Sequence, residues 1–263
     1  MQTENFHTDP KQFTAKKRQQ IVLPDQVVLG DCMELLKHVE DNSIDLIATD
    51  PPYEIGYSNY AWDAKNKLNW DYLAKEFKRI IKPNGSLAIF QGWSNVSKTI
   101  DHLSRYFYLK NWIIYDRVKG RGTKTDLVST REDILWFIND QDNYTYNKIS
   151  SNIKKKTGGT IGRKNGNEYR AMSNVWTDIS PIVPWSRERV NHPTQKSLQL
   201  MDRILGIFSN EGNVVLDCFA GSGSTIISAI NSNRKYIGFE NNAAYFQTMI
   251  NRIKEVKKNY KLF

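Results

Sequence analysis

The segment VVLDCFAGSGSTIISAI, residues 214–230, decides the fold class of this chain. An apolar run ends at Asp217, and the chain then turns through Gly221 and Gly223 into an apparent helix that begins near Ser224. Glycines at such a turn adopt backbone angles denied to other residues and let the backbone approach a ligand closely. A strand, a glycine-rich turn and a helix in this order indicate one unit of a parallel α/β sheet.

The next apolar segment, KYIGFE at 235–240, ends in Glu240, about 20 residues beyond the turn. In nucleoside-binding α/β folds an acidic side chain at this place accepts hydrogen bonds from ribose hydroxyls. The turn lacks the third glycine of the dinucleotide fingerprint, which disfavours a nicotinamide dehydrogenase. The pattern predicts a nucleoside-bearing ligand, and a tight strand–helix turn without a ligand is the alternative.

Seven short apolar segments predict buried strands, because they are rich in β-branched and aromatic residues. They lie at 26–30, 44–50, 86–92, 111–116, 133–138, 213–217 and 235–240. Helical patterns lie at 32–39, 69–82, 195–209 and 243–256, and Asn84-Gly85 predicts a stop and turn after the second. The alternation predicts a Rossmann-like, doubly wound, mostly parallel seven-stranded α/β sheet.

Length and composition restrict the class of protein. The 263 residues, 40% of them hydrophobic, suffice for one large core, so a single α/β domain with insertions is expected. A formal net charge of +9 favours a polyanionic partner. Cys32 and Cys218 are far apart and in no metal-binding spacing, which favours a reducing, cytoplasmic compartment and no metal. No segment approaches the ~20 apolar residues of a membrane span.

A second motif, Asp50-Pro51-Pro52-Tyr53, follows an apolar strand. Consecutive prolines neither extend a strand ladder nor start a helix, because each lacks an N–H and has φ near −65°. If this strand neighbours the strand that ends at Asp217, both carboxyl ends open on one crevice. Asp50 and the Pro51 carbonyl would then accept hydrogens from a planar amine, and Tyr53 would stack on its ring.

The chemistry predicted for this motif is electrostatic. An aromatic amine is a poor nucleophile, because its lone pair is conjugated into the ring. Two acceptors that favour tetrahedral nitrogen would localise that pair as an electrophile arrives, with no covalent enzyme intermediate. Neither cysteine adjoins a proline in the manner of a nucleophile for cytosine C5, so that mechanism is disfavoured.

Three motifs together, DPPY at 50–53, NHPTQKS at 191–197 and DCFAGSGST at 217–225, resemble the S-adenosylmethionine-dependent amino-methyltransferases of DNA. The resemblance extends over nearly the whole chain. Because the catalytic motif precedes the cofactor loop, the chain resembles the beta class, whose fold is circularly permuted. The resemblance implies site-specific transfer of a methyl group from S-adenosyl-L-methionine to N6 of a flipped adenine in DNA.

The resemblance also implies the site residues. Asp50, Pro51, Pro52 and Tyr53 would form the target-base pocket. Glu240 would hold the ribose of the cofactor, Asp31 its adenine, and Thr194 and Lys196 its carboxylate end. The full cofactor-binding set is Asp31, Cys32, Thr194, Lys196, Asp217, Phe219, Gly221, Ser222, Gly223, Ser224, Glu240 and Asn241. Asp31 as a simple helix cap is the alternative, and His192 is interpreted as a structural residue.

The motifs divide the chain into a flexible polar arm (1–20), a catalytic half (21–140), a basic insert (141–190) and a cofactor-binding half of the same domain (191–263). The insert combines glycines with basic side chains suited to phosphates, so it is the candidate target-recognition region, with a solvated loop as the alternative. Residues expected to contact DNA are Arg117, Lys119, Arg121, Lys154, Lys155, Lys156, Arg163, Lys164 and Arg170.

Other functions stay open at this point. Cytosine-N4 methylation shares fold and chemistry, although that branch more often has Ser in place of Asp50. Methylation of RNA or of a protein amide is an alternative, and the latter usually has Asn there. A non-catalytic nucleic-acid-binding module would explain the charge but not the cofactor loop. DNA is the expected partner, no membrane is expected, and a cognate restriction endonuclease and a homodimer stay open.

Overall fold

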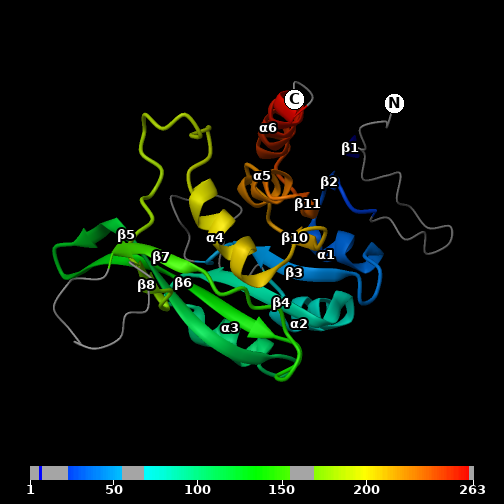
Figure 1. The fold of residues 1–263 in the computed structure, drawn as a ribbon, viewed down its shortest axis with the longest axis horizontal. Coiled ribbons are helices and arrows are strands. Elements are labelled where there is room, and N and C mark those ends of the chain that lie inside the picture. The colour runs from blue at the N-terminus through cyan, green and yellow to red at the C-terminus, as the bar shows by residue number, and fades with distance from the viewer. Residues whose placement is uncertain (1–5, 8–22, 55–67, 155–168, 261–263) are drawn as a thin grey trace.

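The computed structural model describes residues 6–7, 23–54, 68–154 and 169–260 (Figure 1). Its strands are β1 (Phe6–His7), β2 (Gln26–Leu29), β3 (Ile44–Thr49), β4 (Ile81–Gln91), β5 (Tyr108–Thr123), β6 (Asp126–Ile138), β7 (Ser150–Lys154), β8 (Tyr169–Ala171), β9 (Val175–Trp176), β10 (Val214–Asp217) and β11 (Lys235–Glu240). Its helices are α1 (Cys32–Leu35), α2 (Trp70–Ile80), α3 (Val96–Leu103), α4 (Leu198–Phe208), α5 (Ser224–Asn231) and α6 (Ala243–Tyr260), with a 3₁₀ turn η2 (Leu36–His38) after α1.

One nine-stranded sheet organises the fold, in the order β1-β2-β11-β10-β3-β4-β6-β5-β9. Strand β6 runs antiparallel to β4 and β5, and all other neighbours pair in parallel. The seven predicted strands form the body of this sheet, and two-residue strands β1 and β9 extend its edges. The predicted doubly wound, mostly parallel class is confirmed, and the circular permutation stays a prediction.

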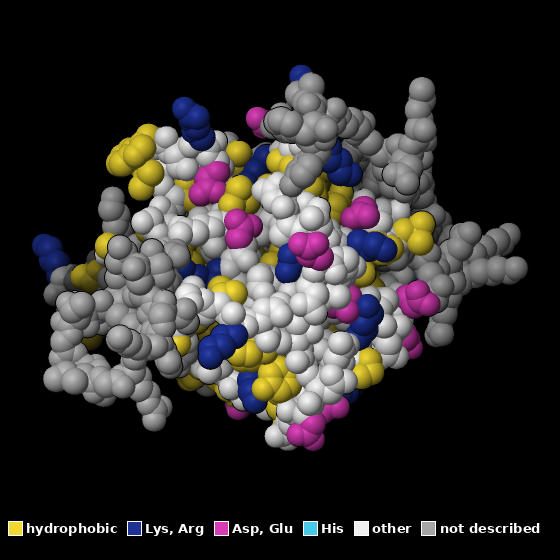
Figure 2. Space-filling view, viewed as in Figure 1, with side chains coloured by type: hydrophobic (Ala, Val, Ile, Leu, Met, Phe, Trp, Pro, Cys, Tyr) yellow, Lys and Arg dark blue, Asp and Glu magenta, His cyan; other side chains and the backbone are white. Residues whose placement is uncertain are grey.

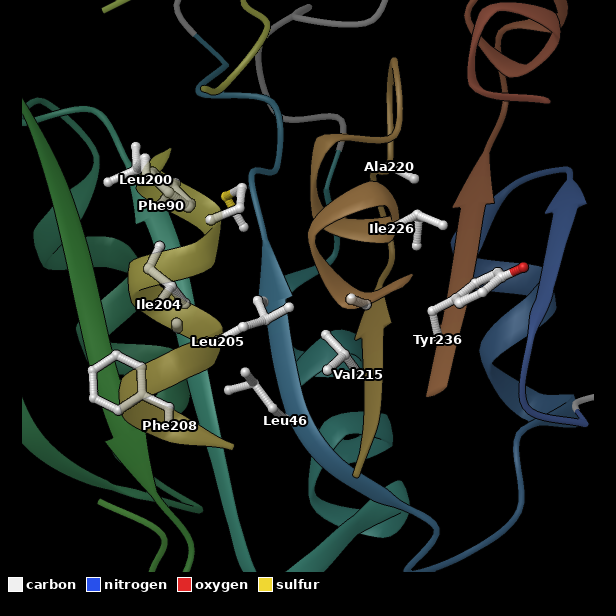
Figure 3. Close-up of a cluster of buried hydrophobic side chains, with 14 of the residues drawn as sticks. Leu46, Phe90, Leu200, Ile204, Leu205, Phe208, Val215, Ala220, Ile226 and Tyr236 are labelled. Atoms are coloured by element: carbon white, nitrogen blue, oxygen red, sulfur yellow. The ribbon is translucent and has the colours of Figure 1, made fainter. Parts of the chain in front are cut away.

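Apolar side chains cover both faces of the sheet. Successive residues of a strand point to opposite faces, so one strand can contribute to the apolar clusters on both faces. On β3, Leu46 and Ala48 join the core beneath α4, α5 and α6, whereas Ile47 joins the core formed with α1, α2 and α3. Figure 3 shows Leu46 and Val215 of the sheet lying against side chains of α4 and α5. Burial of each large side chain contributes roughly 1.5–3 kcal/mol. This two-sided core fixes β3 and β10 side by side.

Several elements differ from the sequence prediction. Helix α3 was not predicted, because only Val96, Thr99 and Leu103 of its eight residues are buried and its apolar period is weak. The hairpin β5–β6 is much longer than the strands expected at 111–116 and 133–138. Within the basic insert at 141–190, where the sequence predicted no strand, β7 and β8 pair into a separate two-stranded sheet.

The end of the second predicted helix also differs. The apolar pattern continues to residue 82, but α2 ends at Ile80 and Ile81 pairs with Ile44 of β3. The next registered pair is Ser86 with Leu46, so the predicted turn at Asn84-Gly85 lies in an irregularity of β4. Sheet pairing therefore overrides helix propensity at this position.

Charge is distributed unevenly along the chain. Acidic and basic residues nearly balance within the described ranges, so most of the net charge of +9 lies in the other segments, above all 8–22 and 155–168. On the face drawn in Figure 2, the described Lys and Arg side chains are interspersed with Asp and Glu. Of the helices that the structure describes, none is both long and apolar enough to cross a membrane.

We expect Gly223→Ala to lower the free energy of unfolding by about 1–3 kcal/mol. Gly223 is the N-cap residue just before α5 and has φ of 84°, and a Cβ there would lie 2.6 Å from Cγ of Met249. The matched control is Gly206→Ala in α4, where a Cβ would meet no atom within 4 Å. It should raise stability by about 0.5–1 kcal/mol, because glycine weakens a helix. Urea unfolding measures both, and equal shifts would contradict the argument.

Candidate active site

A cavity of about 690 Å³ lies at the carboxyl ends of the central strands. Strand β3 pairs with β10 in parallel, Leu46 opposite Val215, so the motifs that follow the two strands meet as expected. The predicted residues that line the cavity are Asp31, Asp50, Pro51, Pro52, Tyr53, Arg117, Thr194, Lys196, Asp217, Phe219, Gly221, Ser222, Ser224, Glu240 and Asn241. Its size suits a nucleoside-sized ligand.

Cys32 and Gly223 do not line this cavity. Asp31 precedes α1, and the side chain of Cys32, the first helical residue, packs in the core and not in the cavity, so a cofactor contact of Cys32 stays a prediction. Burial raises the pKa of the Cys32 and Cys218 thiols, which disfavours a reactive thiolate at either position. In the described part of the chain, no group of three or more His, Cys, Asp or Glu is placed to hold a metal ion.

Asp31 combines the two roles considered from the sequence. Its Oδ1 accepts a hydrogen bond from the Met33 N–H at 2.9 Å and caps α1. The same residue lines the cavity, because the Gly30 N–H donates to the Glu240 carbonyl at 2.9 Å and joins the ends of β2 and β11. Helix capping therefore does not exclude a ligand contact.

Glu240 organises the glycine turn. Its Oε2 accepts from the Gly221 N–H at 2.8 Å, and its Oε1 accepts from the Asn242 N–H at 2.7 Å. Burial raises the pKa of the Glu240 carboxyl, and these N–H groups oppose that rise. Gly221 has φ of 53°, and a Cβ there would lie 2.9 Å from Nε2 of His192. The turn and the segment around His192 thus pack without room for a side chain.

Asp217 ties the two motif-bearing strands together. Its Oδ1 accepts from the Thr49 hydroxyl at 2.6 Å and the Phe219 N–H at 3.1 Å, and its Oδ2 accepts from the Thr225 hydroxyl at 2.6 Å. Burial raises the pKa of Asp217 to about 6, while these hydrogen bonds favour the ionised form. Most of its acceptor capacity is used within the protein, so it positions β3, β10 and α5.

The carboxylate of Asp50 forms an ion pair that the sequence did not predict. Lys196, expected at the carboxylate end of a cofactor, places its Nζ 2.7 Å from Asp50 Oδ2 and 3.2 Å from Glu132 Oε2. Oδ1 of Asp50 and the Tyr53 hydroxyl have no hydrogen bond of ordinary geometry to the described residues. Glu132 was missed, although an acidic residue in the apolar strand segment REDILWF was a signal.

The residues expected to contact DNA are only partly described. Arg117 lines the cavity, 3.4 Å from Glu132 Oε1, and donates to the Ser129 carbonyl at 3.3 Å. The side chains of Lys119, Arg121, Lys154 and Arg170 lie outside the described part of the structure, as do Lys155, Lys156, Arg163 and Lys164 entirely. Sequence reasoning also missed Trp93, a residue that lines the cavity and is 59% exposed.

A doubly wound sheet with a cavity at the carboxyl ends of its strands, lined by carboxylates and a glycine turn, is typical of α/β enzymes that bind a nucleoside-bearing ligand. Residues 44–252 match the family of N6 and N4 methyltransferases described as DNA methylase, and the chain belongs to this family. It is therefore an enzyme, a DNA methyltransferase.

Individual relatives extend over most of the chain. DNA adenine methyltransferase YhdJ of Escherichia coli K12 is 34% identical over 250 residues, which cover 89% of this chain and 84% of YhdJ. Type II methyltransferase M.HpaI of Haemophilus parainfluenzae is 31% identical over 237 residues, 87% of this chain and 74% of M.HpaI. The structure of the M1.HpyAVI–SAM complex matches with a TM-score of 0.62 at 28% identity and covers 86% of this chain and 98% of M1.HpyAVI.

Proposed function

We propose that this enzyme transfers a methyl group from S-adenosyl-L-methionine to the exocyclic N6 of an adenine flipped out of DNA. The observation that carries the proposal is the position of Asp50, which lies in one cavity with Gly221 and Glu240. The cavity thus holds both a carboxylate for the target amine, Asp50, and a carboxylate for the ribose of a nucleoside, Glu240. The name of YhdJ, a DNA adenine methyltransferase, supports adenine as the target.

The residues of the cavity fit the cofactor. Carboxylate oxygens of Glu240 keep lone pairs beyond their two backbone hydrogen bonds and can accept ribose hydroxyls. Asp31 has a second oxygen besides Oδ1 for the amine of the cofactor adenine. Gly221 keeps the turn free of a side chain. S-adenosylmethionine, when bound, supplies an electrophilic methyl group on a sulfonium, and the M1.HpyAVI–SAM complex supports this assignment.

On the target side, the protein binds and orients an amine. Extrusion of a base from a duplex costs a few kcal/mol, which contacts in the pocket must offset. Tyr53 offers a ring face for stacking, and Asp50 Oδ1 and the Pro51 carbonyl offer acceptors. These acceptors favour a tetrahedral amine nitrogen and stabilise the charge that develops on it. The same acceptors serve the amine of cytosine, so N4 methylation is the second candidate.

Product analysis distinguishes the candidates. The protein is incubated with mixed-sequence DNA and S-adenosylmethionine that carries a tritiated methyl group, and the DNA is then digested to nucleosides. We expect label in N6-methyladenine. Label in N4-methylcytosine would replace the adenine assignment, and absence of any labelled nucleoside would contradict methyl transfer to DNA.

Tyr53→Phe should keep the kcat/KM of methyl transfer within a few-fold of wild type, whereas Tyr53→Ala should lower it roughly 10- to 100-fold. The reason is that base–aromatic stacking is worth about 1–3 kcal/mol, and phenylalanine keeps the ring. The ring packs against the backbone, since a Cβ on Gly92 would lie 3.1 Å from Tyr53 Cδ2. Equal losses in both variants would assign the effect to the hydroxyl, which faces Asp50.

The proposed function also assigns roles to the segments of the chain and to its partners. We infer that 141–190 contacts DNA, that 21–140 and 191–263 are two halves of one domain, and that 1–20 is an arm. The interleaving of β2, β11, β10 and β3 in one sheet supports the single domain. The type II name of M.HpaI supports a cognate restriction endonuclease as a partner. The two free cysteines, Cys32 and Cys218, support a cytoplasmic location for this enzyme. A homodimer stays a prediction.

A further inference from the structure

Lys196 lies at the centre of a buried charge cluster in the cavity. It precedes α4, and its side chain is 11% exposed. Its Nζ contacts carboxylates from two elements, Asp50 at the end of β3 and Glu132 on β6, at 2.7 and 3.2 Å. The ammonium also lies 5.0 Å from the centroid of the Phe90 ring and 5.8 Å from that of Tyr53. Burial of an unpaired ammonium would destabilise the fold, because the ion loses its hydration. The two carboxylates offset that cost for Lys196.

The two carboxylate oxygens of Asp50 have different surroundings. Oδ2 is held by Lys196, whereas Oδ1 is buried and has no hydrogen bond of ordinary geometry to the described residues. A carboxylate anchored through one oxygen cannot rotate freely. The other oxygen is therefore pre-oriented as an acceptor.

We propose that Lys196 is a positioning residue that keeps Asp50 in its carboxylate form with Oδ1 directed to the target amine, and that Glu132 holds Lys196 in place from β6. The inference rests on the proposed function, because the amine is the substrate group that Oδ1 would meet. A protonated Asp50 would donate a hydrogen bond, and it would then oppose the amine instead of accepting its hydrogen.

Electrostatics supports this geometry. Burial raises the pKa of Asp50, the Lys196 ammonium lowers it, and the Glu132 carboxylate raises it. The Tyr53 hydroxyl is near enough to lower the pKa of Asp50 slightly further. Lys196 is thus the main group that opposes protonation of the buried acid, and Glu132 acts on it with the opposite sign.

Other charged and titratable groups face the Asp50–Lys196–Glu132 cluster from the neighbouring elements. Burial is the main cause of the raised pKa of Asp217 on β10, and the nearby Asp50 carboxylate raises it further. From β5, Arg117 pairs with Glu132, and burial together with Glu132 raises the pKa of Tyr115 to about 12. On the other side, burial together with Lys196 lowers the pKa of His192 to about 4, so this imidazole is neutral during an assay near pH 7. None of these groups replaces Lys196 as a cation next to Asp50.

The test compares Lys196→Met with Glu132→Gln in the full chain. An opposite charge within 4–6 Å moves a carboxyl pKa by about one to three units. Lys196→Met should therefore move the acidic limb of the pH profile of kcat to higher pH by about one unit or more, because Asp50 protonates more easily. Glu132→Gln should move the limb the other way, and the double variant should fall between them. Cofactor affinity should stay near that of wild type in Glu132→Gln, because Glu132 is not one of the predicted cofactor-binding residues.

The matched control is Lys82→Met. Lys82 Nζ lies 2.7 Å from Oδ2 of Asp45, so it forms an ion pair of the same length at the opposite end of β3, outside the cavity. Its loss should leave the pH profile unchanged. A profile of Lys196→Met that is lowered equally at every pH, without displacement, would overturn the inference.

A second measurement does not need activity. Carboxyl ¹³C resonances of aspartate-labelled protein, with Asp50→Asn used for assignment, report the titration of Asp50 directly. We expect its midpoint to rise in Lys196→Met and to fall in Glu132→Gln. An unmoved midpoint in both variants would overturn the inference even if DNA is methylated. Failure of wild type to label DNA would instead reject the proposed function, while the titration still decides the role of Lys196.

Discussion

Replacing Asp50 with alanine should lower the kcat of methyl transfer by at least about 100- to 1000-fold, the range seen when one preorganised electrostatic contact to a transition state is removed. The carboxylate lies where the target amine would bind, and its Oδ1 is the acceptor with no hydrogen bond of ordinary geometry to the described residues. Asp50→Asn should be nearly as damaging, because an amide directs donors as well as an acceptor at the amine. Tritium transfer to DNA measures both variants.

Binding of the cofactor should change little in Asp50→Ala, because its predicted contacts come from other residues. The fold should also persist, since Lys196 keeps Glu132 as a partner. Asp45→Asn is the matched control: Asp45 pairs with Lys82 at the start of the same strand and lies outside the cavity. A loss of cofactor affinity as large as the loss of turnover in Asp50→Ala would contradict this division of roles.

The fold could be predicted from sequence because its decisive features are local. The apolar strand that ends at Asp50 and the strand that ends at Asp217 both carry their motifs at the carboxyl end. Parallel pairing then forces the motifs onto one edge of the sheet, as the contact between Leu46 and Val215 confirms. The helix start near Ser224 follows equally from the glycines that precede it.

The partners of Asp50 could not be predicted in this way. Glu132 lies on β6, which pairs antiparallel with β4, and β4 in turn lies beside β3. Nothing in the local sequence around Glu132 gives this strand order. Lys196 was predicted at the site from its motif, but the direction of its long side chain depends on where Asp50 and Glu132 converge. Contacts across three strands are set by the tertiary arrangement and have no sequence period.

Cys32 illustrates a different limit of sequence prediction. The residue belongs to a motif at the cavity, but its side chain lies in the core. The residue follows Asp31, which must turn its carboxylate toward the Met33 N–H to cap α1. The next residue then enters the first helical turn and points into the core, where Cys32 is 4% exposed. Helix geometry, and not composition, separates these two neighbours.

Glu240→Ala should raise the dissociation constant of S-adenosylmethionine roughly 10- to 150-fold. The variant loses at least one charge-assisted hydrogen bond to the ribose, and such a bond contributes about 1.5–3 kcal/mol to binding. Isothermal titration calorimetry with the full chain measures the change. Glu211→Gln is the control, because Glu211 is an exposed acid in the turn before β10, at the opposite end of that strand from the cavity.

Glu240 also has a structural role that the experiment must separate from ligand binding. Without its carboxylate, the N–H groups of Gly221 and Asn242 lose their acceptors, at about 1–3 kcal/mol for each group left buried and unpaired. Glu240→Ala should therefore also lower the free energy of unfolding of the unliganded protein. Glu240→Gln retains one carbonyl oxygen, so it should restore part of that stability. If the cofactor affinity of Glu240→Gln recovered fully along with the stability, the carboxylate would serve only to shape the turn. Weak binding in a Glu240→Gln protein of near-normal stability is the expected result, because ribose hydroxyls would then face an amide in place of a charged acceptor.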